Sequence, residues 1–180
     1  MSYYERNLPR WLPEGKHLFI TWRLHGSLPV AVLKALREDK ELLRGKRFVQ
    51  FDRELDSAVF GPAWMNQPKI AMAVTDAISR VVQTGLCVAH AYVVMPNHVH
   101  LLVEPRVELK RITQTIKGAS ARSCNLLPGR TGPFWQEESF DHWVRSATSF
   151  ERIRMYIERN PVSAGLVKTP VDWQWSSAFK

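Results

Sequence analysis

Several common features are scarce in this 180-residue chain, and each shortage excludes a class of protein. The two cysteines, Cys87 and Cys124, lie in apolar or helical surroundings without the spacing of a metal-binding pair, so we predict reduced thiols rather than a disulfide framework. No segment approaches the run of about 20 apolar residues that a membrane-spanning helix needs. The start, Met1 to Lys16, lacks the apolar run of a secretion signal. We therefore expect a cytoplasmic protein without membrane contact.

Acidic residues are also few relative to basic ones. Lys and Arg number 25 against 17 Asp and Glu, which gives a net charge of +8. This surplus is typical of proteins that bind a phosphate backbone, although a basic enzyme with another substrate has the same balance. Hydrophobic residues make up 45% of the chain, enough for the core of one domain. We expect one domain over residues 1–180, with an N-terminal arm over 1–16 and a C-terminal tail over 165–180.

The order of the predicted elements indicates an α+β fold. Short β-branched and aromatic segments predict four strands, at 17–24, 88–95, 98–104 and 139–144. Apolar residues at helical spacing predict three helices and a weaker fourth, at 29–43, 68–83, 107–125 and 49–59. This order matches a ferredoxin-like split βαβ arrangement, whose antiparallel sheet carries helices on one face and leaves the other face open for a ligand.

A last helix is expected after the fourth strand. Thr148 and Glu151 have the spacing of a capping box at its start, and Pro161 should end it. The tail beyond this helix contains Trp173 and Trp175, which predict a strap packed across the body of the protein.

The hexad MPNHVH at 95–100 is the most informative pattern. Because side chains alternate along a strand, His98 and His100 point to one face, while Val99 points to the opposite, apolar face. Two imidazoles on the open face are typical of a divalent metal site, although two exposed strand residues would give the same pattern. Glu104 shares this face and is expected to be solvated rather than a ligand.

Tyr156 and Asn160 supply a second pattern, on the last helix. Four residues apart, they lie on the same side of the helix. A tyrosine placed beside a metal site is a candidate nucleophile. Tyr92 competes formally for this role, but its position within an apolar strand favours packing.

Two strings, AYVVMPNHVHLLVEP and MYIERNPVSAGLV, closely resemble the signature segments of the HUH single-tyrosine transposases, in particular those associated with repetitive extragenic palindromes (REP) in bacteria. The resemblance extends from FITWRLHGSLP through IKGASAR and FWQEESFDHWVR to DWQWSSA. It implies a metal-dependent endonuclease and strand transferase. Such an enzyme cleaves and rejoins single-stranded DNA at palindromic hairpins through a 5′-phosphotyrosine intermediate.

On the matching positions, the resemblance implies that His98, His100 and Asn160 hold the cation and that Tyr156 is the nucleophile. It implies Mg²⁺ or Mn²⁺, whereas ligand softness alone suits zinc or manganese at least as well as magnesium. The implied partner is single-stranded or hairpin DNA with REP-like palindromes, bound by a monomer or a homodimer. Ser163 departs from the family, whose members commonly have arginine there, so the DNA sequence recognised is not carried over.

Candidate DNA contacts are basic or aromatic residues of two elements. They are Lys110, Arg111, Lys117 and Arg122 on the helix after the histidine strand, and Trp22 and Arg23 on the first strand. A solvated helix face and a half-buried strand pair explain the same residues.

The other histidines are given a packing role. We expect His17, His25 and His90 to pack or to end strands rather than to bind metal. His142 belongs to the FDHWVR segment that resembles the family, which makes it a candidate to approach the site.

Two other functions fit parts of the pattern. A metallohydrolase built on the histidine pair would need further His or Asp ligands and would act on a small substrate without a tyrosine adduct. A non-catalytic protein that binds nucleic-acid hairpins would keep the basic helix and would not depend on Tyr156.

Overall fold

A computed structural model describes residues 15–38, 44–57, 61–126 and 131–180. Its centre is a four-stranded sheet in the order β2-β3-β1-β4, in which all neighbouring strands are antiparallel. The strands are β1 (His17–Leu24), β2 (Cys87–Val94), β3 (His98–Pro105) and β4 (Trp135–Val144). The predicted α+β class and ferredoxin-like arrangement are confirmed. The predicted arm, 1–16, lies outside the described residues except for its last two.

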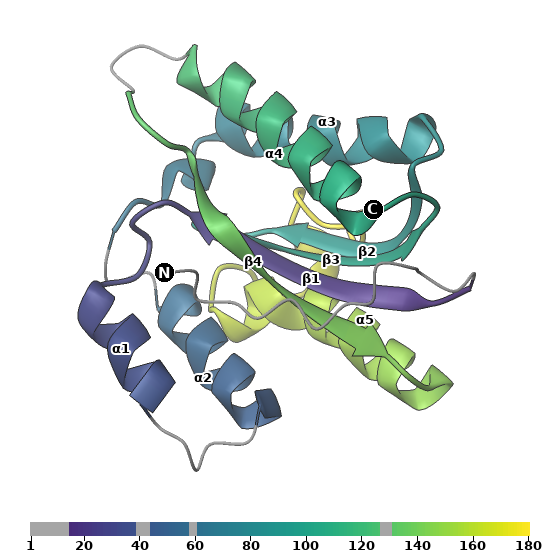
Figure 1. The fold of residues 1–180 in the computed structure, drawn as a ribbon, viewed down its shortest axis with the longest axis horizontal. Helices are drawn as coiled ribbons and strands as arrows, with labels where there is room; N and C mark the ends of the chain where they lie inside the picture. Colours follow the sequence, from purple (N-terminus) through teal and green to yellow (C-terminus); the bar gives the residue numbers. More distant parts are fainter. Residues whose placement is uncertain (1–14, 39–43, 58–60, 127–130) are drawn as a thin grey trace.

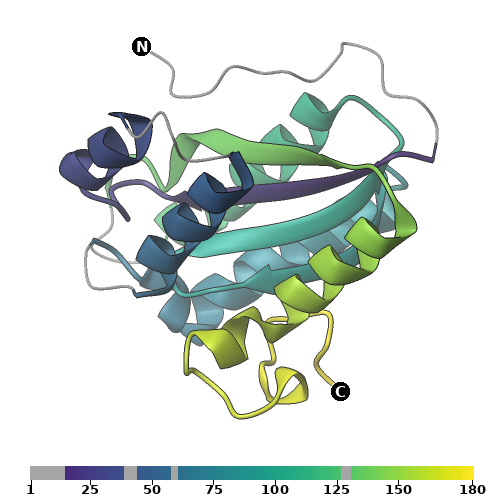
Figure 2. The same ribbon diagram turned by 90° about the horizontal axis from the view of Figure 1, so that it is seen from below.

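Helices cover both faces of this sheet (Figures 1 and 2). On one face lie α3 (Pro68–Gln83) and α4 (Leu109–Asn125), and on the other lie α5 (Ala147–Ser163) and α2 (Arg44–Asp56), with α1 (Val30–Glu38) beside α2. Two 3₁₀ helices, η1 (Trp64–Asn66) and η2 (Pro170–Asp172), complete the elements of the described residues. Among these residues, no helix has the length and apolar character that crossing a membrane requires.

The alternation of side chains along the strands divides the core into two layers. Val99, Leu101 and Val103 of β3 pack in the layer beneath α3 and α4, and Leu102 packs on the opposite side. The predicted alternation is therefore confirmed. The face that carries His98 and His100 is covered rather than open, because α2 and α5 lie over it and both imidazoles are 0% exposed.

Several element boundaries differ from the sequence-based prediction. The first predicted helix ends at Glu38, and its remainder, 39–43, lies outside the described residues. The weak helix starts at Arg44, and residues 58–59 of its predicted end are also outside them. Strand β4 starts at Trp135 rather than at Ser139, because Trp135 pairs with Leu24 and is buried beneath α4.

Both predicted ends of the last helix are wrong. The N-cap is Ser146, whose hydroxyl accepts a hydrogen bond from the backbone N–H of Ser149 at 3.1 Å, so Thr148 lies inside the first turn. Pro161 lies within the helix, which continues to Ser163. Because Pro161 is buried in the last turn, the missing N–H removes only one helical hydrogen bond near an end.

The C-terminal tail runs along the outer edge of β2, as the predicted strap requires. The backbone N–H of Val94 donates to the carbonyl of Trp175 at 2.9 Å, and that of Ser177 donates to the carbonyl of Tyr92 at 3.0 Å. The indole N–H of Trp173 also donates to the carbonyl of Val94 at 3.0 Å. The tail therefore extends the sheet by a short isolated bridge.

Candidate metal and nucleophile site

Strand β3 brings two imidazoles together beneath α2 and α5. The Nε2 atoms of His98 and His100 are 3.1 Å apart, and the ring centroids are 4.7 Å apart. Both nitrogens point to the same place because the residues are two apart on a strand. Their complete burial leaves protein groups, rather than solvent, to determine their protonation.

Asn97 fixes the tautomer of His98. Its amide nitrogen donates to the carbonyl of Leu55 at 2.8 Å, so its oxygen is the atom that lies 2.7 Å from Nδ1 of His98. Nδ1 must therefore carry the proton, and the lone pair of Nε2 points into the site. Nδ1 of His100 has a hydroxyl partner, Oγ1 of Thr21, at 2.7 Å, on the neighbouring strand where the register sets these two residues opposite each other.

Asp52 of α2 is the third group at this place, and the sequence analysis missed it. Its Oδ1 lies 3.2 Å from Nε2 of His100 and 3.8 Å from Nε2 of His98. One ligand atom from each of these three residues falls within 4.8 Å of the others, and all three residues are buried. A sequence signal existed: Asp52 lies at helical spacing between Phe48 and Leu55, so an acid occupies the apolar side of α2.

Burial and charge set the protonation of this group. Burial, together with the charge of His100, lowers the pKa of His98 to about 3, so its imidazole is neutral. Burial alone would raise the pKa of Asp52, but the charges of His100 and His98 and the hydrogen bonds from His100 and Asn160 together outweigh it, so the net pKa is lowered. For Asp56, burial and the nearby Asp52 charge raise the pKa to about 7.

Helix α5 places Tyr156 and Asn160 against the same carboxylate. The Tyr156 hydroxyl donates a hydrogen bond to Oδ2 of Asp52, and the Asn160 amide donates to the same oxygen at 3.4 Å. The Tyr156 ring also lies 5.7 Å from the ring of His100. The structure therefore brings together four residues that the sequence analysis selected, and it adds Asp52 between them.

The donor set fits a divalent cation. Three buried oxygens have no hydrogen-bond partner among the described residues: Oδ1 of Asp52, Oδ1 of Asp56 and Oδ1 of Asn160. A cation would satisfy such oxygens together with the imidazole nitrogens, since mixed nitrogen and oxygen ligands suit Mn²⁺, Mg²⁺ or Zn²⁺. It would also displace any proton held between the two Nε2 atoms.

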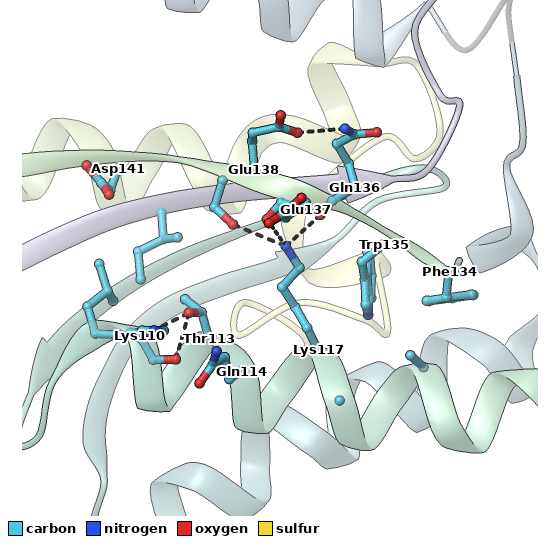
Figure 3. Close-up of a pocket in the computed structure, with 15 residues that line it drawn as sticks. Lys110, Thr113, Gln114, Lys117, Phe134, Trp135, Gln136, Glu137, Glu138 and Asp141 are labelled. Carbon is cyan, nitrogen blue, oxygen red and sulfur yellow. Dashed lines mark hydrogen bonds between the residues drawn. The ribbon is translucent and has the colours of Figure 1, made fainter. Parts of the chain in front are cut away.

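The predicted DNA contacts of α4 divide into two kinds. Lys110, Arg111 and Arg122 are exposed. Lys117 is half-buried, and its ammonium donates to the carbonyl oxygens of Gln136 at 2.6 Å and Glu137 at 2.9 Å, beside a cavity of about 810 Å³ between α4 and β4 (Figure 3). Burial is the main reason why the pKa of Lys117 is lowered to about 8. The Lys117 ammonium is thus already bound by protein groups.

The predicted base contacts of β1 are not exposed. Trp22 is 2% exposed and packs edge-on against Trp135 with a centroid distance of 6.2 Å. Arg23 is 7% exposed, and its guanidinium donates to the Ser27 hydroxyl at 3.3 Å. The base-stacking prediction for Trp22 is wrong for this structure, because helices on both faces leave neither side of β1 free.

His142 is offset from the site histidines along the sheet. Its register partner on β1 is Phe19, whereas Thr21, the residue beside His100, pairs with Phe140. His142 therefore lies one row of side chains further along the sheet, level with Leu102. Of the three remaining histidines, His17 and His90 come together elsewhere on the same face, and His25 is exposed.

Comparison with known proteins identifies a family whose model matches this chain. The model of the IS200-like transposases matches residues 63–160, a segment that contains both site histidines, Tyr156 and Asn160 but not Asp52. No curated protein matches this chain.

Solved structures resemble the fold as well. A REP-associated tyrosine transposase bound to a REP hairpin is 21% identical; the alignment covers 98% of this chain and 82% of the other, with a TM-score of 0.61. A protein from Deinococcus radiodurans R1 described as a transposase is 19% identical over 87% of this chain and 98% of the other, and its TM-score of 0.38 is too low to bear on the argument.

Proposed function

This chain belongs to the IS200-like transposase family, and on that premise we propose that it is a metal-dependent single-stranded DNA endonuclease and strand transferase of the REP-associated branch. Its substrate is a REP-like palindromic hairpin, which it cleaves and rejoins through a 5′-phosphotyrosine intermediate. One observation supports this most directly: the Tyr156 hydroxyl is hydrogen-bonded to Asp52, whose other oxygen lies 3.2 Å from Nε2 of His100.

The two oxygens of Asp52 have different roles: Oδ1 faces the imidazoles and the cation position, and Oδ2 faces Tyr156. Oδ2 accepts the proton of the Tyr156 hydroxyl, which makes the carboxylate a positioned base for a phenol whose ordinary pKa is about 10. The phenolate oxygen attacks phosphorus, the bond from phosphorus to the 3′ oxygen breaks, and that oxygen leaves as a hydroxyl after receiving a proton. The reverse reaction with a 3′ hydroxyl rejoins the strands, because the phosphotyrosine conserves the bond energy.

His98, His100, Asp52 and Asn160 would hold the cation. A bound Mg²⁺ or Mn²⁺ supplies positive charge that polarises the scissile phosphate. The protein's part is to keep the His98 lone pair directed into the site through Asn97 and to keep Asn160 one helical turn from Tyr156.

Access to this site requires α2 to move. Both imidazoles are 0% exposed and Asp52 is 1% exposed, so a phosphodiester cannot contact them while α2 lies on the sheet. The Asn97 amide bond to the carbonyl of Leu55 is one contact that holds α2 in this position. We expect hairpin binding to be followed by displacement of α2.

Adduct formation on end-labelled REP-like hairpin DNA tests the proposal. With Mn²⁺ present, the wild-type chain should give a protein–DNA adduct that survives SDS, and Tyr156→Phe should give none while it still binds the hairpin. Tyr92→Phe, a half-buried tyrosine on β2, is the matched control and should retain the adduct. An adduct in Tyr156→Phe would transfer the nucleophile to another residue.

The same assay separates the two other functions. If the protein binds hairpins without catalysis, the wild type and Tyr156→Phe should bind the DNA equally well, and neither should form an adduct. A metallohydrolase would show cation-dependent hydrolysis of a small phosphate ester that Tyr156→Phe leaves unchanged. His98→Ala and His100→Ala should abolish cleavage with hairpin binding retained, because binding depends mainly on phosphate and base contacts.

A further inference from the structure

A second cluster of ligand-type side chains lies on the same face of the sheet, away from the first. It consists of His17 at the start of β1, His90 of β2 and Glu104 near the end of β3. These strands are neighbours in the sheet, with β3 in the middle. His17 is four residues along β1 from Thr21, the partner of His100, which corresponds to about 13 Å along the strand. The two clusters are therefore separate.

A β-bulge brings His90 into this cluster. Ala89 pairs with Val103 and Ala91 pairs with Leu102, so His90 is an extra residue opposite two consecutive residues of β3. Ala89 packs in the layer beneath α3 and α4, and Ala91 packs in the other layer. The bulge lets His90 join Ala91 on the α5 side, and bulges of this kind often redirect a side chain beside a functional site.

The distances are close to those of a metal site. One ligand atom from each of the three residues lies within 4.8 Å of the others, and Nε2 of His90 is 3.9 Å from a carboxylate oxygen of Glu104. Ligands of a tetrahedral Zn²⁺ are about 3.4 Å apart, given bond lengths of about 2.1 Å. Small rotations of partly exposed side chains close this difference.

The surroundings favour a neutral histidine ligand. Nε2 of His90 is buried and has no hydrogen-bond partner among the described residues. Phe150 of α5 packs against both imidazoles, with centroid distances of 4.7 Å to His17 and 5.1 Å to His90. Burial, with the charge of His17, lowers the pKa of His90 and leaves a lone pair available. An orphaned buried nitrogen beside a carboxylate is what a cation would satisfy.

We propose that His17, His90 and Glu104 form a second metal site, specific for a borderline-soft divalent cation of the Zn²⁺ type. Two imidazoles and one carboxylate form a three-ligand set that leaves a position for water. The cation joins three adjacent strands next to the first turns of α5. Its role is structural, because the cluster is separate from Tyr156. The sequence-based expectation was that His17 and His90 pack, and both rings do pack against Phe150; the proposal adds metal binding to that packing.

Zn²⁺ stoichiometry, measured by titration against a chromophoric chelator, tests this site. The wild-type chain should bind two equivalents. His90→Asn and Glu104→Gln should each bind one, and His100→Ala should also bind one, from the other cluster. His25→Asn, an exposed histidine outside both clusters, is the matched control and should bind two.

Stability provides a second readout that does not depend on activity. In the His100→Ala background, Zn²⁺ should raise the midpoint of thermal unfolding, and adding Glu104→Gln, which preserves side-chain shape, should abolish that rise. Circular dichroism before the titration establishes that each variant is folded. Two results would overturn the proposal. In the first, the wild type binds only one equivalent of Zn²⁺, and His100→Ala binds none. In the second, both His90→Asn and Glu104→Gln still bind two equivalents.

Discussion

The side-chain oxygen of Asn97 accepts a hydrogen bond from Nδ1 of His98 at 2.7 Å. The opposite end of the same amide donates to the carbonyl of Leu55 on α2 at 2.8 Å. One buried side chain therefore both sets the tautomer of a candidate ligand and attaches the helix that carries Asp52. The relationship connects cation binding to the position of α2.

Asn97→Ala should weaken cation binding. Loss of a partner that orients a metal-binding histidine typically reduces affinity by about 10- to 100-fold. Calorimetric titration with Mn²⁺ measures the effect, and Asn66→Ala, an exposed asparagine on η1, is the control. Unchanged affinity in Asn97→Ala would mean that His98 is held by other contacts.

Asp52→Asn should abolish adduct formation with hairpin binding retained. The substitution preserves shape but removes the charge that faces the imidazoles and the base that accepts the Tyr156 proton. Glu54→Gln, on the same helix, controls for the loss of one acid. Gel analysis of labelled adduct at saturating Mn²⁺ gives the result, and wild-type adduct levels in Asp52→Asn would remove this residue from the site.

Trp22→Ala should lower the free energy of unfolding by about 3–5 kcal/mol, as expected when a large core side chain leaves a cavity. Met72→Ala, at a position of α3 that is 50% exposed, should change it by less than about 0.5 kcal/mol. Urea unfolding followed by fluorescence measures both. A small effect at Trp22 would return this ring to the list of candidate base contacts.

Lys117 should make stability depend on pH in an alkaline window. Its pKa is about 8 in the folded chain against an ordinary value of 10.5, so between these values the unfolded chain binds more protons and the free energy of unfolding rises with pH. The difference between wild type and Lys117→Met should therefore increase from pH 8 to pH 10.5.

Urea unfolding at several pH values in this window measures the Lys117 effect. Lys110→Met, an exposed lysine on the same helix, is the matched control. A wild-type minus Lys117→Met difference that stays flat across the window would contradict the buried ammonium seen beside Gln136 and Glu137.

Local spacing accounts for the parts of the fold and site that the sequence predicted. Alternation on β3 placed both histidines on one face, and helical spacing placed Asn160 beside Tyr156. The ends of elements were less predictable, because they depend on contacts with distant residues. Trp135 extends β4 because it pairs with Leu24, and the residues around position 139 do not predict that pairing.

The missed residues required tertiary information. Asp52 lies on a helix whose pattern is weak, and the sequence does not show that this helix packs onto the sheet above the two histidines. His17, His90 and Glu104 meet only because of strand order, register and a bulge. Trp22 was predicted as a possible base contact because the sequence of one strand does not show that helices cover both faces of the sheet.

The tail covers part of the outer edge of β2. The backbone N–H of Val94 donates to the Trp175 carbonyl, that of Ser177 donates to the Tyr92 carbonyl, and that of Tyr92 donates to the Ser177 hydroxyl. A chain shortened before Trp173 would present these backbone donors and acceptors of β2 to any other extended chain, and such exposed edges favour edge-to-edge pairing. Removal of residues 173–180 is therefore expected to favour pairing between copies of the chain along β2.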